Sequence, residues 1–259
     1  MTTVLDRIVG ALDGHARLAI AVSGGVDSMT LAHIASRDSR TTATMYHASS
    51  PAVPAAARER VEAHAARHGW QLVVVDAQEL ADARYRANPV DRCYYCKTNL
   101  YDRIASVTTD TIASGTNRDD LSDFRPGLRA AQEHVVVHPY VEAGATKRDI
   151  YEIAQALGLA DLARLPAQPC LASRVETGIA IDPSDLQFID AVEARLAATL
   201  GGQATVRCRV THRGIVIELG DADGSEDARA IGARACAEAG RTFAGVRPYA
   251  RGAAFLHKG

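Results

Sequence analysis

A short apolar run that stops at two glycines constrains the fold of this chain more than any other feature. Residues 18–22 are continuously apolar, as in a strand buried on both faces, and they lead into Ser23, Gly24 and Gly25. The pattern of residues 27–37 then predicts a helix. A buried strand, a glycine-rich turn and a helix in succession indicate a parallel sheet with helices on both faces.

The same alternation continues along the chain. Further strands are predicted at residues 44–48, 72–76, 111–114 and 134–141, and helices at 55–68, 96–105 and 146–158. We therefore expect an α/β domain with an open parallel sheet over residues 1–165. In such folds, ligands bind beyond the carboxyl ends of the strands.

Two prolines within four residues, Pro166 and Pro169, end this domain because neither can continue a helix. We expect a linker at 166–181 that carries Cys170, followed by a smaller α+β domain at 182–259. Its predicted elements are helices at 184–200 and 223–239, strands at 206–210 and 215–219, and a further strand near Phe243.

The charge balance argues against a protein that mainly grips nucleic acid, since 29 basic and 31 acidic residues give a net charge of −2. Apolar runs are far shorter than the ~20 residues of a membrane span, so no membrane association is expected. The first residues lack a basic stretch followed by an apolar one, which favours a cytoplasmic location. Arginine is the common cation here, so the two internal lysines, Lys97 and Lys147, are candidate functional residues.

The turn after the first strand has the chemistry of a phosphate site. Gly24 and Gly25 allow a tight turn and a close approach of an anion, the following helix start offers N–H groups, and Ser23 and Ser28 add hydroxyls. Asp27 is acidic beside this anion site, which makes sense if it meets a Mg²⁺ ion or orients a loop donor. The lysine of a GxxxxGK[ST] loop is missing.

Five cysteines, an odd number, do not suggest a disulfide framework, and Cys208 and Cys236 fit small apolar core positions. Cys93 and Cys96 form a CxxC pair that three kinds of site could use: a redox pair, a zinc site or an iron–sulfur site with a third cysteine. Zinc would need a second CxxC, which the sequence lacks. Cys170 is the candidate third ligand.

The motif Ser23-Gly24-Gly25-Val26-Asp27-Ser28 resembles the signature of the PP-loop ATP pyrophosphatases, as do residues 115–117 and 146–149. This resemblance implies a fold of the adenine nucleotide alpha hydrolase type. It also implies cleavage of ATP between its α and β phosphates and adenylation of a substrate oxygen. Lys147 would then support the nucleotide phosphates, together with Ser23, Gly24, Gly25, Asp27 and Ser28.

Residues 91–97, 123–128, 170–174 and 206–209 narrow the resemblance to the LarE-type sulfur transferases, and it covers most of the chain. In that family a carboxylate of a pyridinium mononucleotide is adenylated and then receives sulfur. The resemblance implies catalytic roles for Cys170, Asp27, Lys97 and Arg174, and substrate binding by Asp123, Arg125, Arg207 and Arg209. Arg207 and Arg209 alternate on a predicted strand and so share one face, which is equally typical of a solvated sheet surface.

Two variants of this family differ in their sulfur source. One sacrifices the nucleophilic cysteine, and the other holds a [4Fe-4S] cluster on three cysteines; this chain, with Cys93, Cys96 and Cys170, resembles the second. The implied cofactors are ATP, Mg²⁺ and the cluster, and the implied partners are a small nucleotide-like substrate, a sulfur donor and a second copy of the chain as a homo-oligomer. Residues 175–178 depart from the family pattern, which leaves the substrate open.

Three other functions fit parts of the sequence. A tRNA-thiolating enzyme of the same superfamily would use similar cysteines, but it would carry a basic domain or extra CxxC pairs. An amide-forming synthetase would leave the three cysteines without a role. A nucleotide-binding protein without enzymatic activity would leave Asp27 and the cysteines unexplained.

Overall fold

The computed structural model describes residues 2–122, 125–166, 169–201, 205–220 and 223–250. It divides the chain into two compact units, Met1–Glu79 with Asp91–Gln168, and Leu80–Val90 with Pro169–Gly259. We call these the first and the second unit and describe each by itself. No helix in the described part of the chain is long and apolar enough to cross a membrane.

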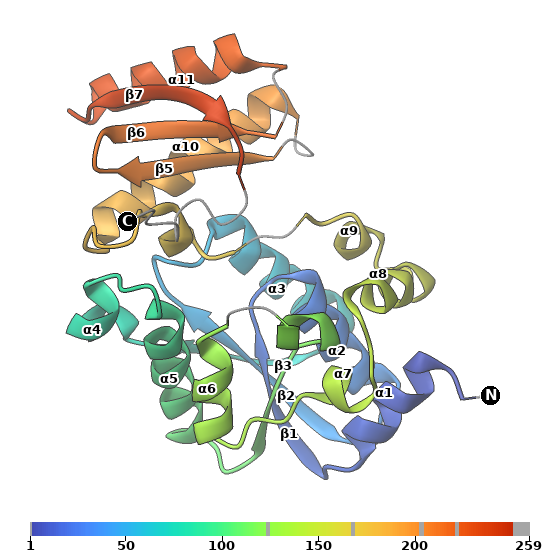
Figure 1. Ribbon diagram of the computed structural model, residues 1–259. Helices are drawn as coiled ribbons and strands as arrows, with labels where there is room; N and C mark the ends of the chain where they lie inside the picture. The colour runs from blue at the N-terminus through green and yellow to red at the C-terminus, as the bar shows by residue number, and fades with distance from the viewer. Residues whose placement is uncertain (1, 123–124, 167–168, 202–204, 221–222, 251–259) are drawn as a thin grey trace. The chain divides into compact units, whose positions relative to one another are not determined.

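The first unit is built on a four-stranded sheet in the order β3-β2-β1-β4, in which all neighbours are parallel (Figure 1). Its strands are β1 (Arg17–Val22), β2 (Thr42–Ser49), β3 (Gln71–Asp76) and β4 (Thr111–Ser114). This architecture confirms the predicted fold class. The helices are α1 (Val4–Asp13), α2 (Val26–Arg37), α3 (Ala55–His68), α5 (Arg92–Ala105), α6 (Gly127–Glu133), α7 (Pro139–Glu142), α8 (Lys147–Ala156) and α9 (Ala160–Ala163), with the 3-10 helix η2 (Arg118–Ser122).

Alternate residues of β1 enter two separate cores, one on each face of the sheet. Leu18 and Ile20 pack with α1, α2 and α8, whereas Ala19 and Ala21 pack with α5 and α6. Successive side chains of a strand point to opposite faces, so a strand covered on both sides must be apolar throughout. This explains why residues 18–22 form a continuous apolar run.

The predicted fifth strand at residues 134–141 is wrong. His134 ends α6, and Val137 makes only an isolated bridge with Ala113 of β4 before α7 begins at Pro139. Proline has no N–H group to donate to a ladder, so the strand cannot continue through Pro139. The chain therefore touches the edge of the sheet once and turns into a helix.

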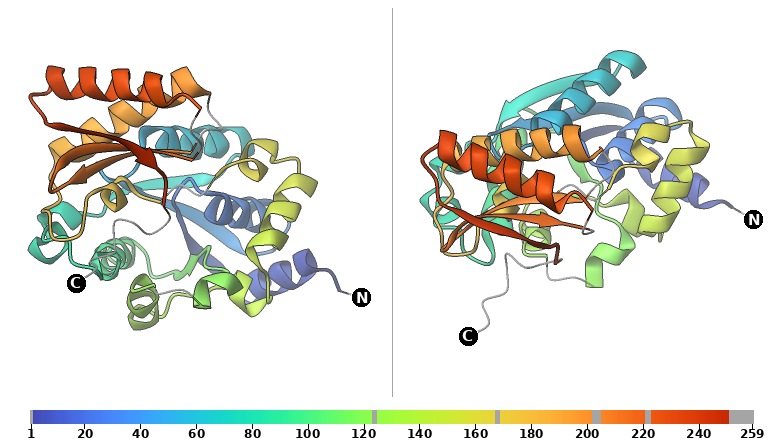
Figure 2. Two further views of the ribbon diagram at one scale, coloured as in Figure 1. Left: turned by 45° about the horizontal axis from the view of Figure 1, so that its top comes forward. Right: turned by 90° about the horizontal axis from the view of Figure 1, so that it is seen from above.

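The second unit contains a three-stranded sheet in the order β5-β6-β7, with β5 and β6 antiparallel and β6 and β7 parallel. Figure 2 shows α10 and α11 side by side along one face of this sheet. Its elements are α4 (Ala83–Arg86), η3 (Leu171–Arg174), α10 (Pro183–Leu200), β5 (Val206–Thr211), β6 (Gly214–Leu219), α11 (Ser225–Glu238) and β7 (Phe243–Pro248); the short helix η1 (Glu79–Ala81) lies at the boundary.

A short excursion of the chain, residues 80–90, belongs to the second unit. The fully buried amide of Asn88 donates to the carbonyl oxygens of Glu176 and Ile179 at 3.0 and 2.9 Å, and the Ile181 N–H donates to the Arg86 carbonyl at 2.8 Å. The predicted domain limits at residues 165 and 181 do not include this excursion, and they stay predictions.

Candidate active site

The glycine-rich turn lies between β1 and α2, at the carboxyl end of the parallel sheet. Gly25 is the N-cap of α2, and no side chain caps this helix. The first N–H groups of a helix have no partner within the helix, and the helix dipole adds positive potential there. The start of α2 is therefore suited to an anion.

Close packing around the turn requires glycine at two positions. Gly24 has φ +81°, and a Cβ atom there would lie 2.6 Å from the Ala57 carbonyl oxygen on α3. A Cβ on Gly115, directly after β4, would lie 2.8 Å from the Ser28 amide nitrogen. These contacts bring α3 and the β4 loop against the turn, so that backbone rather than side chains forms its walls.

The two serines of the motif fix the turn from within. The Ser23 N–H donates to Ser28 Oγ at 3.0 Å, the two hydroxyl oxygens are 3.1 Å apart, and Ser28 Oγ donates to the Gly25 carbonyl at 3.2 Å. Ser28 is buried and Ser23 is exposed. Ser28 therefore has a structural role in shaping the turn, and Ser23 is the hydroxyl that an incoming ligand can reach.

Asp27 and Lys147 lie 120 positions apart in the sequence and meet beside the turn. Lys147 Nζ is 2.5 Å from Asp27 Oδ2, and Asn117 Nδ2 lies 3.4 Å from the other carboxylate oxygen. Lys147 begins α8 behind a capping box formed by Thr146 and Asp149. Both charged side chains are about one-third exposed, so each can exchange its partner for a ligand.

Tyr140 forms a hydrogen bond with the backbone of Asp27. Its hydroxyl donates to the Asp27 carbonyl at 3.0 Å, and burial, with a smaller contribution from Asp27, raises its pKa well above the ordinary value. The phenol therefore stays protonated and remains a donor. Tyr140 was not identified from the sequence, because no motif or spacing marks it. Only the turn of the chain after residue 137 brings its hydroxyl to the first turn of α2.

These residues fit ATP as the ligand of the turn. The walls are backbone, the helix start provides donors, and a cation and a carboxylate stand at its edge. When bound, ATP would supply the phosphoanhydride for adenylation. Ser23, Gly24, Gly25 and Lys147 would hold its phosphates, and Asp27 would hold Mg²⁺.

The CxxC pair lies in the first two turns of α5. Cys93 and Cys96 are half-buried and share one side of the helix through their three-residue spacing. Neighbouring Tyr94 donates to Glu133 Oε2 of α6 at 2.7 Å, and the Arg129 guanidinium lies over its ring at 3.8 Å. The pair thus sits on a helix that α6 holds in place.

Three further predicted site residues lie near α5 and α6 in the chain. Lys97 packs beside Gly127, where a Cβ would lie 3.0 Å from its Cγ, and its Nζ is 5.9 Å from the Tyr101 ring centroid. Arg125 pairs with Asp120 at 2.6 Å. Asp123 lies outside the described residues.

Cys170, in the second unit, precedes η3 and is half-buried. Arg174 donates to the carbonyl of Cys170 at 3.1 Å and to that of Pro169 at 2.6 Å, and it forms a two-pronged ion pair with Glu193 at 3.0 Å. The Arg174 side chain is only 3% exposed. Arg174 therefore acts on the backbone that carries Cys170.

Arg207 and Arg209 point to the face of the β5–β6–β7 sheet that α10 and α11 leave uncovered. Arg209 pairs with the fully buried Glu218 at 2.6 Å and donates to the Ser173 carbonyl at 2.7 Å, and Arg247 reaches the same carboxylate. Burial, followed by repulsion from Arg174, lowers the pKa of Arg207. Because Arg207, Arg209 and Arg247 share this face with Glu218, the face carries more positive than negative charge.

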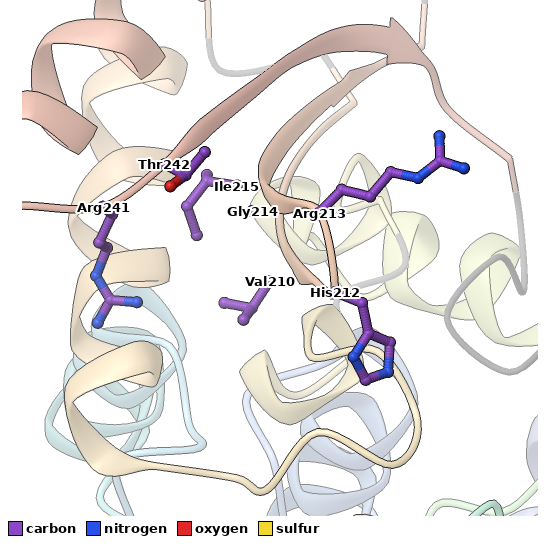
Figure 3. Close-up of a pocket in the computed structure, with 7 residues that line it drawn as sticks. All are labelled: Val210, His212, Arg213, Gly214, Ile215, Arg241 and Thr242. Carbon is purple, nitrogen blue, oxygen red and sulfur yellow. The ribbon is translucent and has the colours of Figure 1, made fainter.

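Two hollows open on the second unit. One, of about 520 Å³, is lined by Arg209, Arg213, Arg247 and Glu176, among others. A second, of about 280 Å³, lies at the turn of the β5–β6 hairpin, with Arg213 and Arg241 on opposite sides of Val210 and Ile215 (Figure 3). The larger hollow is lined by Arg209, one of the three predicted substrate-binding arginines.

Within the described residues, no three histidine, cysteine or carboxylate side chains form a group that could hold a metal ion. Cys93 and Cys96 lie in the first unit and Cys170 in the second. The thiolate chemistry of the three residues suits an iron–sulfur cluster, but their grouping stays a prediction.

Comparisons with known proteins place the chain in a family. No family model matches it. The uncharacterized protein slr1717 of Synechocystis is 36% identical over 207 residues, which cover 78% of this chain and 76% of slr1717. The chain belongs to the slr1717 family. The uncharacterized protein MJ0830 of Methanocaldococcus jannaschii is 29% identical over 195 residues, 74% of this chain and 73% of MJ0830.

A remote homologue carries a functional name. The pyridinium-3,5-bisthiocarboxylic acid mononucleotide synthase of Lactiplantibacillus plantarum is 27% identical over 230 residues, which cover 86% of this chain and 81% of that enzyme. The similarity spans most of both chains. It supports, at the family level, the resemblance to LarE-type enzymes.

Proposed function

We propose that this protein is an AMP-forming, ATP-dependent sulfur transferase of nickel-pincer nucleotide cofactor biosynthesis, with pyridinium-3,5-biscarboxylic acid mononucleotide as its substrate. The observation that carries the proposal is the uncapped turn at the end of β1 with the Asp27–Lys147 pair at its edge. The remote homologue is named for a thiocarboxylate mononucleotide product, which agrees with this chemistry.

In the first half-reaction, a substrate carboxylate oxygen attacks the α-phosphorus of ATP, and pyrophosphate leaves with the bond electrons. The start of α2 and Lys147 would bind the phosphate oxygens and stabilise the charge that develops on the leaving group. Asp27 would release Lys147 to the phosphates and hold Mg²⁺. The product is an acyl adenylate, whose carbonyl carbon is open to a nucleophile.

In the second half-reaction, a sulfur nucleophile attacks that carbon and AMP leaves. Arg174 would fix the Cys170 backbone, so that the thiol meets the carbonyl in one orientation. Arg207, Arg209, Asp123 and Arg125 are the proposed substrate contacts, and Lys97 is the proposed catalytic cation beside the CxxC pair.

The sulfur comes either from Cys170 itself or from sulfide on a cluster held by Cys93, Cys96 and Cys170. A bound cluster would supply sulfide without consuming the protein. In the sacrificial route the Cys170 sulfur, once bonded to the substrate carbonyl carbon, leaves Cβ by elimination of the Cα proton. The sulfur stays on the substrate as a thiocarboxylate, and Cys170 becomes dehydroalanine, about 34 Da lighter. Mass spectrometry of protein prepared without oxygen, before and after one turnover, separates the two routes.

The proposal is tested by pyrophosphate release from ATP–Mg²⁺ with the biscarboxylate mononucleotide, together with mass analysis of the product. We expect AMP, pyrophosphate and a thiocarboxylate. Asp27→Asn should lower pyrophosphate release by about 100-fold or more, since it removes the carboxylate that would hold Mg²⁺ at the phosphates. Asp110→Asn is the matched control, because Asp110 pairs with Arg17 at the opposite end of the sheet; it should retain the wild-type rate.

Other products would contradict the proposal. ADP and phosphate would exclude adenylation, an amide product would indicate a synthetase, and sulfur found in tRNA would indicate the thiolating relatives. We also propose a cytoplasmic location and a homo-oligomer; fractionation and light scattering test these two.

A further inference from the structure

One stripe of α3 faces the phosphate turn and continues into a group of histidines. Ala57 contacts Gly24, Arg60 follows one turn later, and His64 follows after another turn. His64 is buried, and its Nε2 lies 2.7 Å from an Asp161 carboxylate oxygen. The α3 helix therefore does more than cover the sheet, because its Arg60 side chain reaches the turn itself.

Arg60 donates from Nη1 to the carbonyl oxygen of Gly24 at 2.7 Å. Its side chain is half-buried, and burial lowers its pKa while nearby Asp161 opposes that effect. A guanidinium remains charged under these conditions because its ordinary pKa is far above neutrality. The Gly24 carbonyl thus receives a charge-assisted hydrogen bond from outside the turn.

This hydrogen bond sets the direction of the next amide. The peptide group is planar and trans, so its N–H points opposite to its C=O. With the Gly24 carbonyl directed to Arg60, the Gly25 N–H is directed into the turn, where it lies 3.4 Å from Ser23 Oγ. That distance is at the long limit of a hydrogen bond, so the N–H is available to an anion in the turn.

Two adjacent glycines need such an anchor. Glycine populates positive and negative φ almost equally, so the peptide between Gly24 and Gly25 can rotate at low cost. After rotation the carbonyl oxygen, not the N–H, would face a phosphate. We propose that Arg60 is a positioning residue that locks the Gly24–Gly25 peptide in the orientation that binds phosphate. This inference rests on the proposed function for its ligand, ATP.

The first test measures ATP–Mg²⁺ binding by calorimetry in wild type, Arg60→Ala and Arg60→Lys. We expect roughly ten- to a hundred-fold weaker binding in R60A, as for other displaced binding groups. Free guanidinium at non-denaturing concentrations should restore binding to R60A. R60K keeps the positive charge, and its ATP–Mg²⁺ affinity should lie between those of wild type and R60A. Arg58→Ala is the matched control, because Arg58 lies on the same helix in an exposed pair with Glu62.

The second test needs no ligand and follows deuterium uptake of the peptide that contains residues 23–28. We expect faster uptake in R60A than in R58A, and slower uptake again when guanidinium is added. Equal ATP affinity in R60A and R58A, or a turn in R60A that exchanges at the wild-type rate, would overturn the inference. Wild type that does not bind ATP would refute the proposed function, while the exchange comparison would still decide whether Arg60 holds the turn.

Discussion

Arg174 holds the backbone on which Cys170 sits. Its guanidinium makes a two-pronged ion pair with Glu193 and bonds to the carbonyls of residues 169 and 170. Glu193 also accepts the Cys208 N–H at 2.9 Å. The Arg174–Glu193 pair thus joins η3, α10 and β5. The predicted catalytic role of Arg174 would be exerted through the position of Cys170.

Arg174→Met should destabilise the protein by about 3–5 kcal/mol, because it leaves the Glu193 carboxylate, which is only 16% exposed, without its cation. Urea unfolding followed by circular dichroism measures this change. Arg195→Met, also on α10, removes an exposed pair with Glu238 and should cost less than about 1 kcal/mol. Equal effects of the two substitutions would show that the buried pair contributes little.

The β1–turn–α2 element depends on Gly24 for two separate reasons, its positive φ and its contact with Ala57. Gly24→Ala should therefore lower the free energy of unfolding by more than the strain of a left-handed residue alone, which is about 1–2 kcal/mol. Gly158→Ala isolates the strain, because Gly158 has φ +74° and no atom within 4 Å of a new Cβ. Comparable unfolding midpoints for the two variants would refute the collision with α3.

The α2–α3 pair brings together His33 and His64, which are buried, and His68, which is half-buried; this grouping predicts a pH-dependent stability. The ring centroids of His33 and His68 are 4.6 Å apart, and those of His64 and His68 are 5.4 Å apart. Burial lowers the pKa of His33, with a further contribution from His68. Burial also lowers the pKa of His68, with a further contribution from His64.

The sign of the effect follows from proton binding. Below their ordinary pKa of 6.5, His33 and His68 bind more protons in the unfolded chain than in the folded protein. Their neutral forms therefore favour folding above this pH, and that contribution is lost as the pH falls. The urea midpoint should drop between about pH 7.5 and about pH 5.5. The double variant His33→Gln, His68→Gln should flatten this drop, and His212→Gln, on the exposed hairpin, should leave it unchanged.

At the scale of the whole molecule, the chain leaves the first unit at residue 80 and returns at residue 91. Asn88 anchors this excursion within the second unit through its buried amide, and it does so with φ +52°. Asparagine tolerates this left-handed conformation better than most residues. Its side chain and backbone therefore both favour the observed turn.

Asn88→Ala should expose the segment it holds, so that residues 175–181 exchange their amide hydrogens faster. Asn88→Gly removes the same hydrogen bonds but tolerates the positive φ, and it should have the smaller effect. Hydrogen exchange read by mass spectrometry makes the comparison. Unchanged exchange in both variants would mean that the backbone bonds of residues 86 and 88 suffice.

Most of the parallel sheet could be predicted from the sequence, because strands buried on two faces must be apolar at every position. The continuous run at residues 18–22 carries that signal directly, whereas the apolar run at 72–75 forms the edge strand β3, in which Val74 is half exposed. The false strand at 134–141 carries the same signal, since its valines are apolar too. Pro139, which the sequence itself shows, argues against a strand through this segment, whereas the single bridge at Val137 is visible only in the structure.

By itself the sequence determined the fold class and the glycine-rich turn, because both depend on local patterns: a buried strand, two glycines and a helix start within eleven residues. The resemblance to a known family already implied Lys147 at that turn, but only the tertiary structure shows the contacts that distant residues make there. Lys147 reaches Asp27, Tyr140 supports it and Arg60 holds the Gly24 carbonyl because parallel strands end at one edge and bring separate loops together there. Such contacts depend on the packing of α3, α7 and α8, which no spacing along the chain encodes.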